Sequence, residues 1–64
     1  MKRFIEFTRV GGEPFCIDVD QIVGLNIRGL IVGPHGQEVH TEMQYEDLKE
    51  LLRFNDVAIF IKGD

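Results

Sequence analysis

The chain begins with apolar and polar residues in alternation, which is the two-residue period of a half-buried β-strand. Apolar Ile5 and Phe7 alternate with polar neighbours, and this predicts a first strand over residues 2–10. A Gly-Gly pair follows, and two residues that tolerate positive φ are typical of a tight hairpin turn. We therefore expect a β-hairpin whose second strand covers residues 15–17.

Residues 18–21, Asp-Val-Asp-Gln, predict a corner after this hairpin. The Asp18 side chain can accept hydrogen bonds from the backbone amides that follow it, which favours an Asx turn or one turn of 3₁₀ helix. We expect Val19 and Ile22 to turn inward there, while both carboxylates face water.

Three more short strands follow the corner. Residues 22–28 alternate strictly and predict a third strand. One face of that strand is expected to carry Val23, Leu25 and Ile27. Residues 30–32 predict a fourth strand, and a Gly-Pro-His-Gly turn separates it from a fifth strand over residues 37–41.

The period then changes to that of an amphipathic helix. Its apolar positions fall at helical spacing, namely Tyr45, Leu48, Leu51 and Leu52. Acidic residues in the first turn and Arg53 in the last turn match the helix dipole. The sequence allows two positions for the start of the helix. Thr41 and Gln44 fit a capping box, and Gln44 can also be the boundary itself. The Asn-Asp pair at residues 55–56 is expected to end the helix.

Residues 57–61, Val-Ala-Ile-Phe-Ile, are the most hydrophobic run of the chain. Five apolar residues without alternation predict a strand that is covered on both faces. A domain with one helix can hardly cover both faces by itself, so we expect this strand to be central in the sheet or to lie at a subunit interface. Deletion of residues 57–64 is then expected to cost folding or oligomerisation.

These elements predict a small α+β domain: a curved antiparallel β-meander in the order β-β-β-β-β-α-β, with one helix packed on the sheet. With 64 residues, the chain is expected to form a single domain over residues 1–64. A domain of this size buries only about 60% of its unfolded surface and often depends on disulfides, metals or oligomerisation. The single cysteine cannot form an intramolecular disulfide, so self-association is the favoured support.

Charge and cysteine content narrow the function classes. The net charge of −4 arises in the second half of the chain, and an acidic balance counts against a general nucleic-acid binder, because phosphate neutralisation supplies most of the affinity. A single cysteine suggests a reducing, cytoplasmic compartment. Polar residues interrupt the N-terminal apolar stretch, and no run approaches the roughly 18 apolar residues of a membrane span. We expect a soluble cytoplasmic protein without membrane contact.

Four stretches resemble the small flagellar-operon proteins of the FlbD type. They are FIEFTRVGGEPFCID, the DQI corner, GLIVGPHGQEVH and YEDLKELL, which together span about residues 4–52. The resemblance implies a strand, a Gly turn, a strand, an acidic corner, a hairpin and an acidic helix in that order. The same order is similar to the core of LytTR-type DNA-binding domains, whose longer, basic sheet face this chain lacks. Neither resemblance implies a catalytic residue.

The residues that could carry chemistry also have structural interpretations, which we favour. Cys16 has no neighbouring His or Asn to orient a base, and in an apolar strand it is expected to be a small buried hydrophobe. Asp18 and Asp20 could pair as acid and base, but an Asp in a corner already caps a turn. His35 and His40 could share a metal with a neighbouring Glu, yet their spacing is irregular.

Two surfaces remain as candidates for binding. The acidic outer face of the helix could dock a basic partner, where it would mainly raise the association rate and the specificity. A strip of basic residues beside Phe4 or Phe7 could stack the bases of a single-stranded nucleic acid. That strip would consist of Arg3, Arg9 and Arg28.

The sequence therefore favours a non-enzymatic protein–protein interaction or regulatory module that self-associates through a sheet edge or its C-terminal strand. The expected interaction residues are Val57, Ile59, Phe60, Ile61, Glu46, Asp47 and Glu50. The expected partner is a protein, foremost a second copy of the chain. The alternative is a nucleic-acid-binding regulator that uses the three arginines. No catalytic residue, cofactor or metal is expected.

Overall fold

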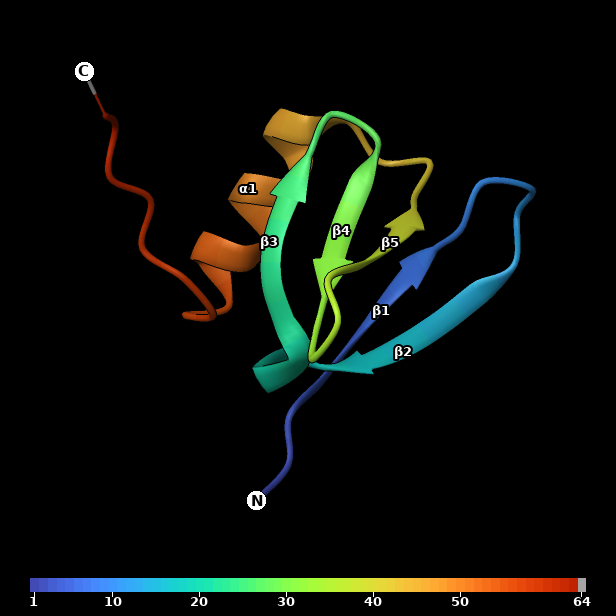
Figure 1. Cartoon of the computed structure of the whole chain (residues 1–64), viewed down its shortest axis with the longest axis horizontal. Helices are drawn as coiled ribbons and strands as arrows, with labels where there is room; N and C mark the ends of the chain where they lie inside the picture. Colours follow the sequence, from blue (N-terminus) through green and yellow to red (C-terminus); the bar gives the residue numbers. More distant parts are fainter. Residues whose placement is uncertain (64) are drawn as a thin grey trace.

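The computed structural model describes residues 1–63, which form five strands in two antiparallel sheets with one α-helix beside them (Figure 1). In chain order the elements are β1 (Phe4–Thr8), β2 (Pro14–Asp18), the 3₁₀ turn η1 (Val19–Gln21), β3 (Ile22–Asn26), β4 (Gly29–Val32), β5 (Gln37–His40) and α1 (Tyr45–Phe54). The α+β class with antiparallel strands and one helix, expected from the sequence, is confirmed.

The first sheet is the hairpin of β1 and β2. Its register runs from Phe4 opposite Asp18 to Thr8 opposite Pro14. The chain reverses at Gly11 and Gly12, whose φ values of 104° and 92° lie in the region that side chains rarely adopt. The hairpin and its Gly-Gly turn are therefore confirmed.

The second sheet has the strand order β3-β4-β5, and a short seam joins it to the first sheet. At the seam Arg9, just after β1, pairs with Thr41, just after β5, and backbone hydrogen bonds of 3.0 and 3.1 Å flank this bridge. The strands therefore follow each other in space as β2-β1-β5-β4-β3. The predicted meander is interrupted at η1, and β2 and β3 are the two free edges.

The corner between β2 and β3 forms as the sequence predicts. The Asp18 carboxylate accepts a hydrogen bond from the backbone N–H of Asp20 at 3.0 Å and caps η1. Val19 is buried and Ile22 packs against the core. This corner turns the chain from the first sheet into the second.

The predicted alternation of the third strand is wrong because β3 contains a bulge. The register passes from Ile22 opposite Val32 to Gly24 opposite Ile31, so Val23 is an extra residue on this strand. Val23 is 64% exposed and Ile27, beyond the end of β3, is 83% exposed. Of the three residues expected on one inner face, only Leu25 packs against the core.

The core lies between α1 and the inner faces of the two sheets. It consists of the buried side chains Phe7, Leu30, Val32, Leu48 and Leu52. Leu48 and Leu52 come from one face of α1, as the helical spacing predicts, and both are almost completely buried. The burial of this apolar face is what holds the short helix on the sheets.

The two ends of α1 distinguish between the predicted alternatives. The helix begins at Tyr45, and Gln44 is its N-cap residue without a capping hydrogen bond from its side chain. The boundary at Gln44 is therefore observed, and the capping box with Thr41 is not formed. At the other end the Asn55 side chain donates to the carbonyl of Leu51 at 2.8 Å, which ends the helix where expected.

Residues 57–61 do not form a strand, so the prediction of a central C-terminal strand is wrong. The N–H of Val57 donates to the carbonyl of Leu52 at 2.8 Å, and the chain then runs as an irregular segment along the side of α1 (Figure 1). Because α1 occupies the inner face of the sheets, the segment lies outside both ladders. Within residues 1–63 no helix has the length and apolar character needed to cross a membrane.

Candidate interaction surface

The C-terminal segment, defined as residues 57–61, is covered on one side only. Val57, Ala58 and Phe60 pack against the core, whereas Ile59 is 90% exposed and Ile61 is 88% exposed. Two large aliphatic side chains thus face water two residues apart. From Ala58 to Ile61 the side chains thus alternate between the core and water, which is the pattern of a half-buried strand.

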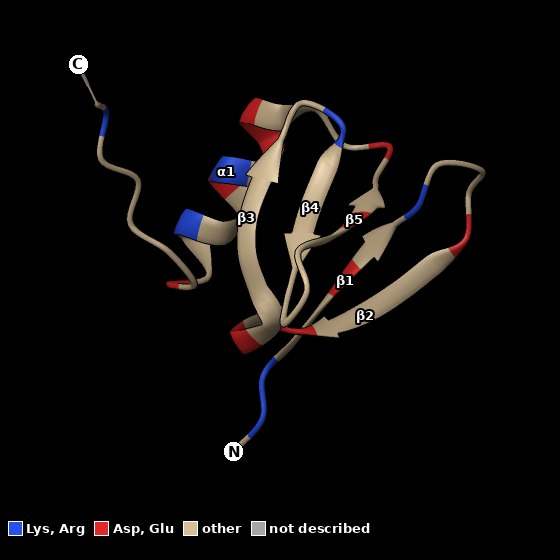
Figure 2. Ribbon diagram, viewed as in Figure 1, with Lys and Arg blue, Asp and Glu red and all other residues tan. Residues whose placement is uncertain are grey.

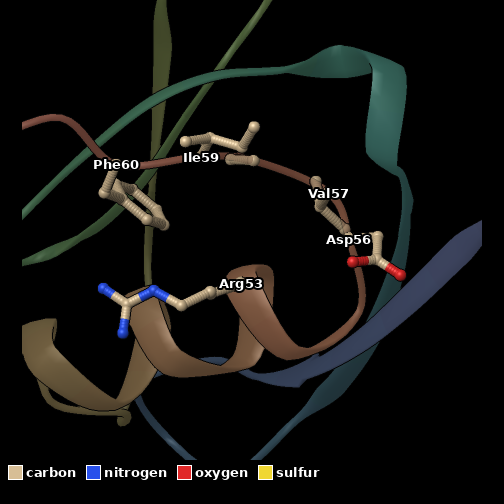
Figure 3. Close-up of a pocket in the computed structure, with 6 residues that line it drawn as sticks. Arg53, Asp56, Val57, Ile59 and Phe60 are labelled. Atoms are coloured by element: carbon tan, nitrogen blue, oxygen red, sulfur yellow. The ribbon is translucent and has the colours of Figure 1, made fainter.

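Phe60 fixes the C-terminal segment to α1 through two cations. The Nζ atom of Lys49 lies 5.6 Å and the Cζ atom of Arg53 lies 5.9 Å from the centroid of the Phe60 ring. Figure 3 shows Arg53 and Phe60 pointing toward one another from the helix and from the segment. Lys49 also lies 5.3 Å from the Tyr45 ring. Each such contact contributes about 0.5–1 kcal/mol at an exposed site.

The acidic residues expected to bind a partner lie on the same helix, and two of them are paired. Glu46 lies 4.0 Å from Lys49, and Glu50 forms an ion pair with Arg53. Asp47 is exposed beside them. The two cations that contact Phe60 therefore also neutralise part of the acidic face, so charge of both signs alternates along α1 (Figure 2).

A groove separates the C-terminal segment from the free edge of the second sheet. It has a volume of about 230 Å³ and is lined by residues 22–25 on one side and mainly by Val57, Ala58 and Phe60 on the other. Among residues 1–63 no backbone hydrogen bond crosses from the segment to β3. Both the segment and the β3 edge therefore keep backbone groups that a further strand could bind.

A second hollow opens on the other side of the segment. Its volume is about 530 Å³, and it lies between Arg53 and the turn at Asp56 below and residues 57–60 above (Figure 3). The segment thus borders open space toward the β3 edge and toward Arg53. Val57, Ala58 and Phe60 are the side chains that pack it against the core.

The three arginines of the predicted basic strip do not lie together. Arg3 precedes β1 and donates to the backbone carbonyl of Asn55, whereas Arg9 follows β1 and lies 6.0 Å from the Phe15 ring. Arg28 lies in the turn after β3 and pairs with Glu38 at 3.2 Å. Arg9 and Arg28 share one end of the sheets, and Arg3 is at the other end.

The residues with potential chemistry take structural positions. Cys16 is exposed, which corrects the expectation that it is buried, and its sulfur lies 3.9 Å from a carboxylate oxygen of Glu6. His35 and His40 are both exposed. Across the described chain no group of three His, Cys, Asp or Glu side chains could hold a metal ion. Asp18 caps η1. Its carboxylate accepts a hydrogen bond from the backbone N–H of Asp20 and a second one from Lys2, and these bonds lower the pKa of the Asp18 carboxyl group.

Three residues of this surface, Lys49, Arg53 and Val23, were not predicted from the sequence. Lys49 and Arg53 are four residues apart and so share one helix face, a spacing that could have pointed to a joint contact. Exposure of Val23 on the free edge of β3 depends on the bulge, for which Gly24 in a strand is the only sequence signal.

Comparison of the chain with models of protein families, with curated proteins and with solved structures finds no match. The resemblances to FlbD-type and LytTR-type proteins thus stay predictions, and the function has to be argued from the geometry of this surface.

Proposed function

We propose that this protein is a non-enzymatic interaction or regulatory module of the cytoplasm that works by self-association through its C-terminal segment and a sheet edge. The observation that carries this proposal is the exposure of Ile59 and Ile61, at 90% and 88%, on a segment that belongs to no sheet. Association of two copies would remove these two large aliphatic side chains from water.

The small core supports the same proposal. Among residues 1–63 only six hydrophobic side chains are buried, which is little for a chain that cannot add an intramolecular disulfide. Association of two copies would bury the apolar side chains that each copy leaves in water. Small domains gain much of their stability in this way.

The charged residues of α1 fit the rim of such an interface. Glu46 lies beside the segment, Glu50 pairs with Arg53, which contacts Phe60, and Asp47 is exposed on the same helix. Typical interfaces surround an apolar centre with a polar rim of this kind. We expect these residues to influence the rate and the specificity of association more than its strength.

The alternative of a nucleic-acid-binding regulator receives less support. Arg3, Arg9 and Arg28 lie at both ends of the sheets, and each already contacts another group of the chain. A stacking strip would need these cations side by side along one face.

The first experiment compares the mass of the purified chain with that of the variant Ile59→Ser/Ile61→Ser by light scattering over a range of concentrations. We expect an oligomer for the wild type and a monomer for the variant. Val10→Ser removes an exposed apolar side chain in the hairpin turn and should leave the oligomer intact. The double substitution is preferable to deletion of residues 57–64, which also removes the core contacts of Val57, Ala58 and Phe60.

Affinity purification from the native cell, with and without nuclease, provides the second readout. A homo-oligomer that survives nuclease supports the proposal. A wild-type chain that is monomeric at every concentration overturns it. Loss of all bound material on nuclease treatment overturns it in favour of the nucleic-acid alternative.

A further inference from the structure

We infer that the C-terminal segment of one copy adds as an antiparallel strand to the β3 edge of a second copy. The segment of the second copy pairs with β3 of the first in the same way. The inference rests on the proposed function and names the two surfaces that meet. It makes the interface two-fold symmetric, with each copy both donating and accepting a strand.

The acceptor is a free sheet edge of matching length. Among residues 1–63, β3 (Ile22–Asn26) pairs only with β4, so its outer side carries unpaired backbone groups. It has five residues, as many as the C-terminal segment. The exposed side chain of Val23 gives this edge an apolar position, and an uncovered edge strand with apolar side chains is a template for a further strand.

Charge argues against pairing of the segment with β3 of its own copy. Within one copy the segment runs in the same direction as β3, since both rise from the corner at η1 toward the far end of the sheet (Figure 1). A strand added in this direction would bring Asp56 toward Asp20 and Lys62 toward Arg28. Both ends would then join like charges.

The reverse direction, available to a second copy, joins opposite charges at both ends. Antiparallel pairing of residues 57–61 with β3 places Lys62 beside Asp20 and Asp56 beside Arg28. Within residues 1–63, Asp20, Asp56 and Lys62 take part in no ion pair, so their charges are available. Arg28 would share its charge between Glu38 and Asp56, so the pair of Asp20 with Lys62 is the one to test. Antiparallel ladders are also slightly more stable per residue than parallel ones.

The test exchanges the charges of Asp20 and Lys62 between two variants. In a dimer of Asp20→Lys, position 20 of each copy is positive and lies beside the positive Lys62 of the other copy. In a dimer of Lys62→Glu, position 62 of each copy is negative and lies beside the negative Asp20 of the other copy. At low ionic strength we expect each variant alone to dimerise about tenfold more weakly than the wild type. In an equal mixture of the two variants, position 62 of each variant lies beside position 20 of the other, and the two charges are opposite at both contacts. A heterodimer should therefore form with wild-type affinity. Native mass spectrometry with one variant isotope-labelled detects it.

The control is Glu13→Lys, which makes the same change in net charge as Asp20→Lys at an exposed position in the β1–β2 turn. It should leave the dimer unchanged. A wild-type dimer that neither variant weakens, or a weakened one that the mixture does not restore, overturns the strand exchange and leaves self-association standing. A wild type that is monomeric at every concentration overturns the self-association itself, and the strand exchange with it.

Discussion

A Cβ atom on Gly29 would lie 2.2 Å from the backbone oxygen of Val39, far inside the distance at which real atoms meet. Gly29 has a φ of 152° and opens β4, where the absent side chain lets β5 approach closely. We therefore expect Gly29→Ala to destabilise the fold by several kcal/mol, about 3 or more, because backbone itself would have to shift. Urea unfolding followed by circular dichroism measures the loss.

The matched control is Gly36→Ala. Gly36 also has a positive φ, 71°, but nothing lies within 4 Å of the Cβ position. This variant should lose only about 1 kcal/mol from backbone strain. Equal losses at Gly29 and Gly36 would mean that the close approach to Val39 is not what requires glycine.

The inner face of α1 should be the most sensitive part of the core. Leu48 has 0% of its surface exposed, so Leu48→Ala should cost about 2–5 kcal/mol, enough to unfold much of a domain this small. Leu51, on the same helix but only partly buried, should tolerate alanine with a clearly smaller loss. Thermal unfolding of both variants compares them, and a larger loss at Leu51 would contradict the placement of the helix.

The contact of Phe60 with the two cations gives a third prediction. Phe60→Leu keeps an apolar side chain but removes the ring over Lys49 and Arg53, and should cost about 1 kcal/mol. Lys49→Met, which keeps the aliphatic stem, should give a smaller loss of the same sign. Both are measured by urea unfolding in the monomeric Ile59→Ser/Ile61→Ser background. No change with Phe60→Leu would show that the rings and cations do not hold the segment.

The structure also predicts a loss of stability in acid. Hydrogen bonds lower the pKa of Asp18 below 3.8 and that of Glu38 below 4.5. A carboxyl group with a lowered pKa in the folded state contributes stability above its ordinary value and loses that contribution as the pH falls through the lowered one. Stability should therefore drop below about pH 4.5. Asp18→Asn/Glu38→Gln should show a shallower decline in urea midpoints, and an unchanged acid slope would count against both contacts.

The turn after β3 allows the cause of one of these shifts to be tested. The side-chain amide of Asn26 donates to Glu38 at 2.8 Å and is the largest cause of its lowered pKa, ahead of the Arg28 charge. Asn26→Ala and Arg28→Gln should each raise the pKa of Glu38, because each removes a group that lowers it. An NMR titration of the Glu38 carboxyl carbon reports both values, and an unchanged pKa in Asn26→Ala would mean that the hydrogen bond from Asn26 does not lower it.

Most local elements of this fold could be predicted from the sequence because their signals are local. The Gly-Gly pair, the carboxylate of Asp18 and the 3.6-residue period around Leu48 each act within a few residues. The exposed helix positions Glu46, Asp47 and Glu50 followed from the same period. The ion pairs of Glu46 with Lys49 and of Glu50 with Arg53 join residues three apart, so their spacing is a local signal as well.

The errors arise where packing between distant residues decides. A bulge at Val23 shifts the inner and outer positions of β3 by one, which a strict alternation cannot reveal. Cys16 is exposed because it lies opposite Glu6 on the outer face of the hairpin, while Phe15 and Ile17 on either side of it pack against the core. Residues 57–61 have a strand-like composition, but α1 covers the sheet before they reach it. Whether a second copy supplies the missing strand is what the proposed experiments decide.

The seam between Arg9 and Thr41 has a consequence for the order of folding. Each hairpin closes a loop of only a few residues, whereas the seam joins positions 32 residues apart. Loop closure is slower and costs more conformational entropy when the joined positions are farther apart in the sequence. The hairpins and α1 are therefore expected to gain structure before β1 meets β5. The rate-limiting event for this small chain would then be the meeting of its two sheets, and substitutions at the seam would slow refolding more than those in either turn.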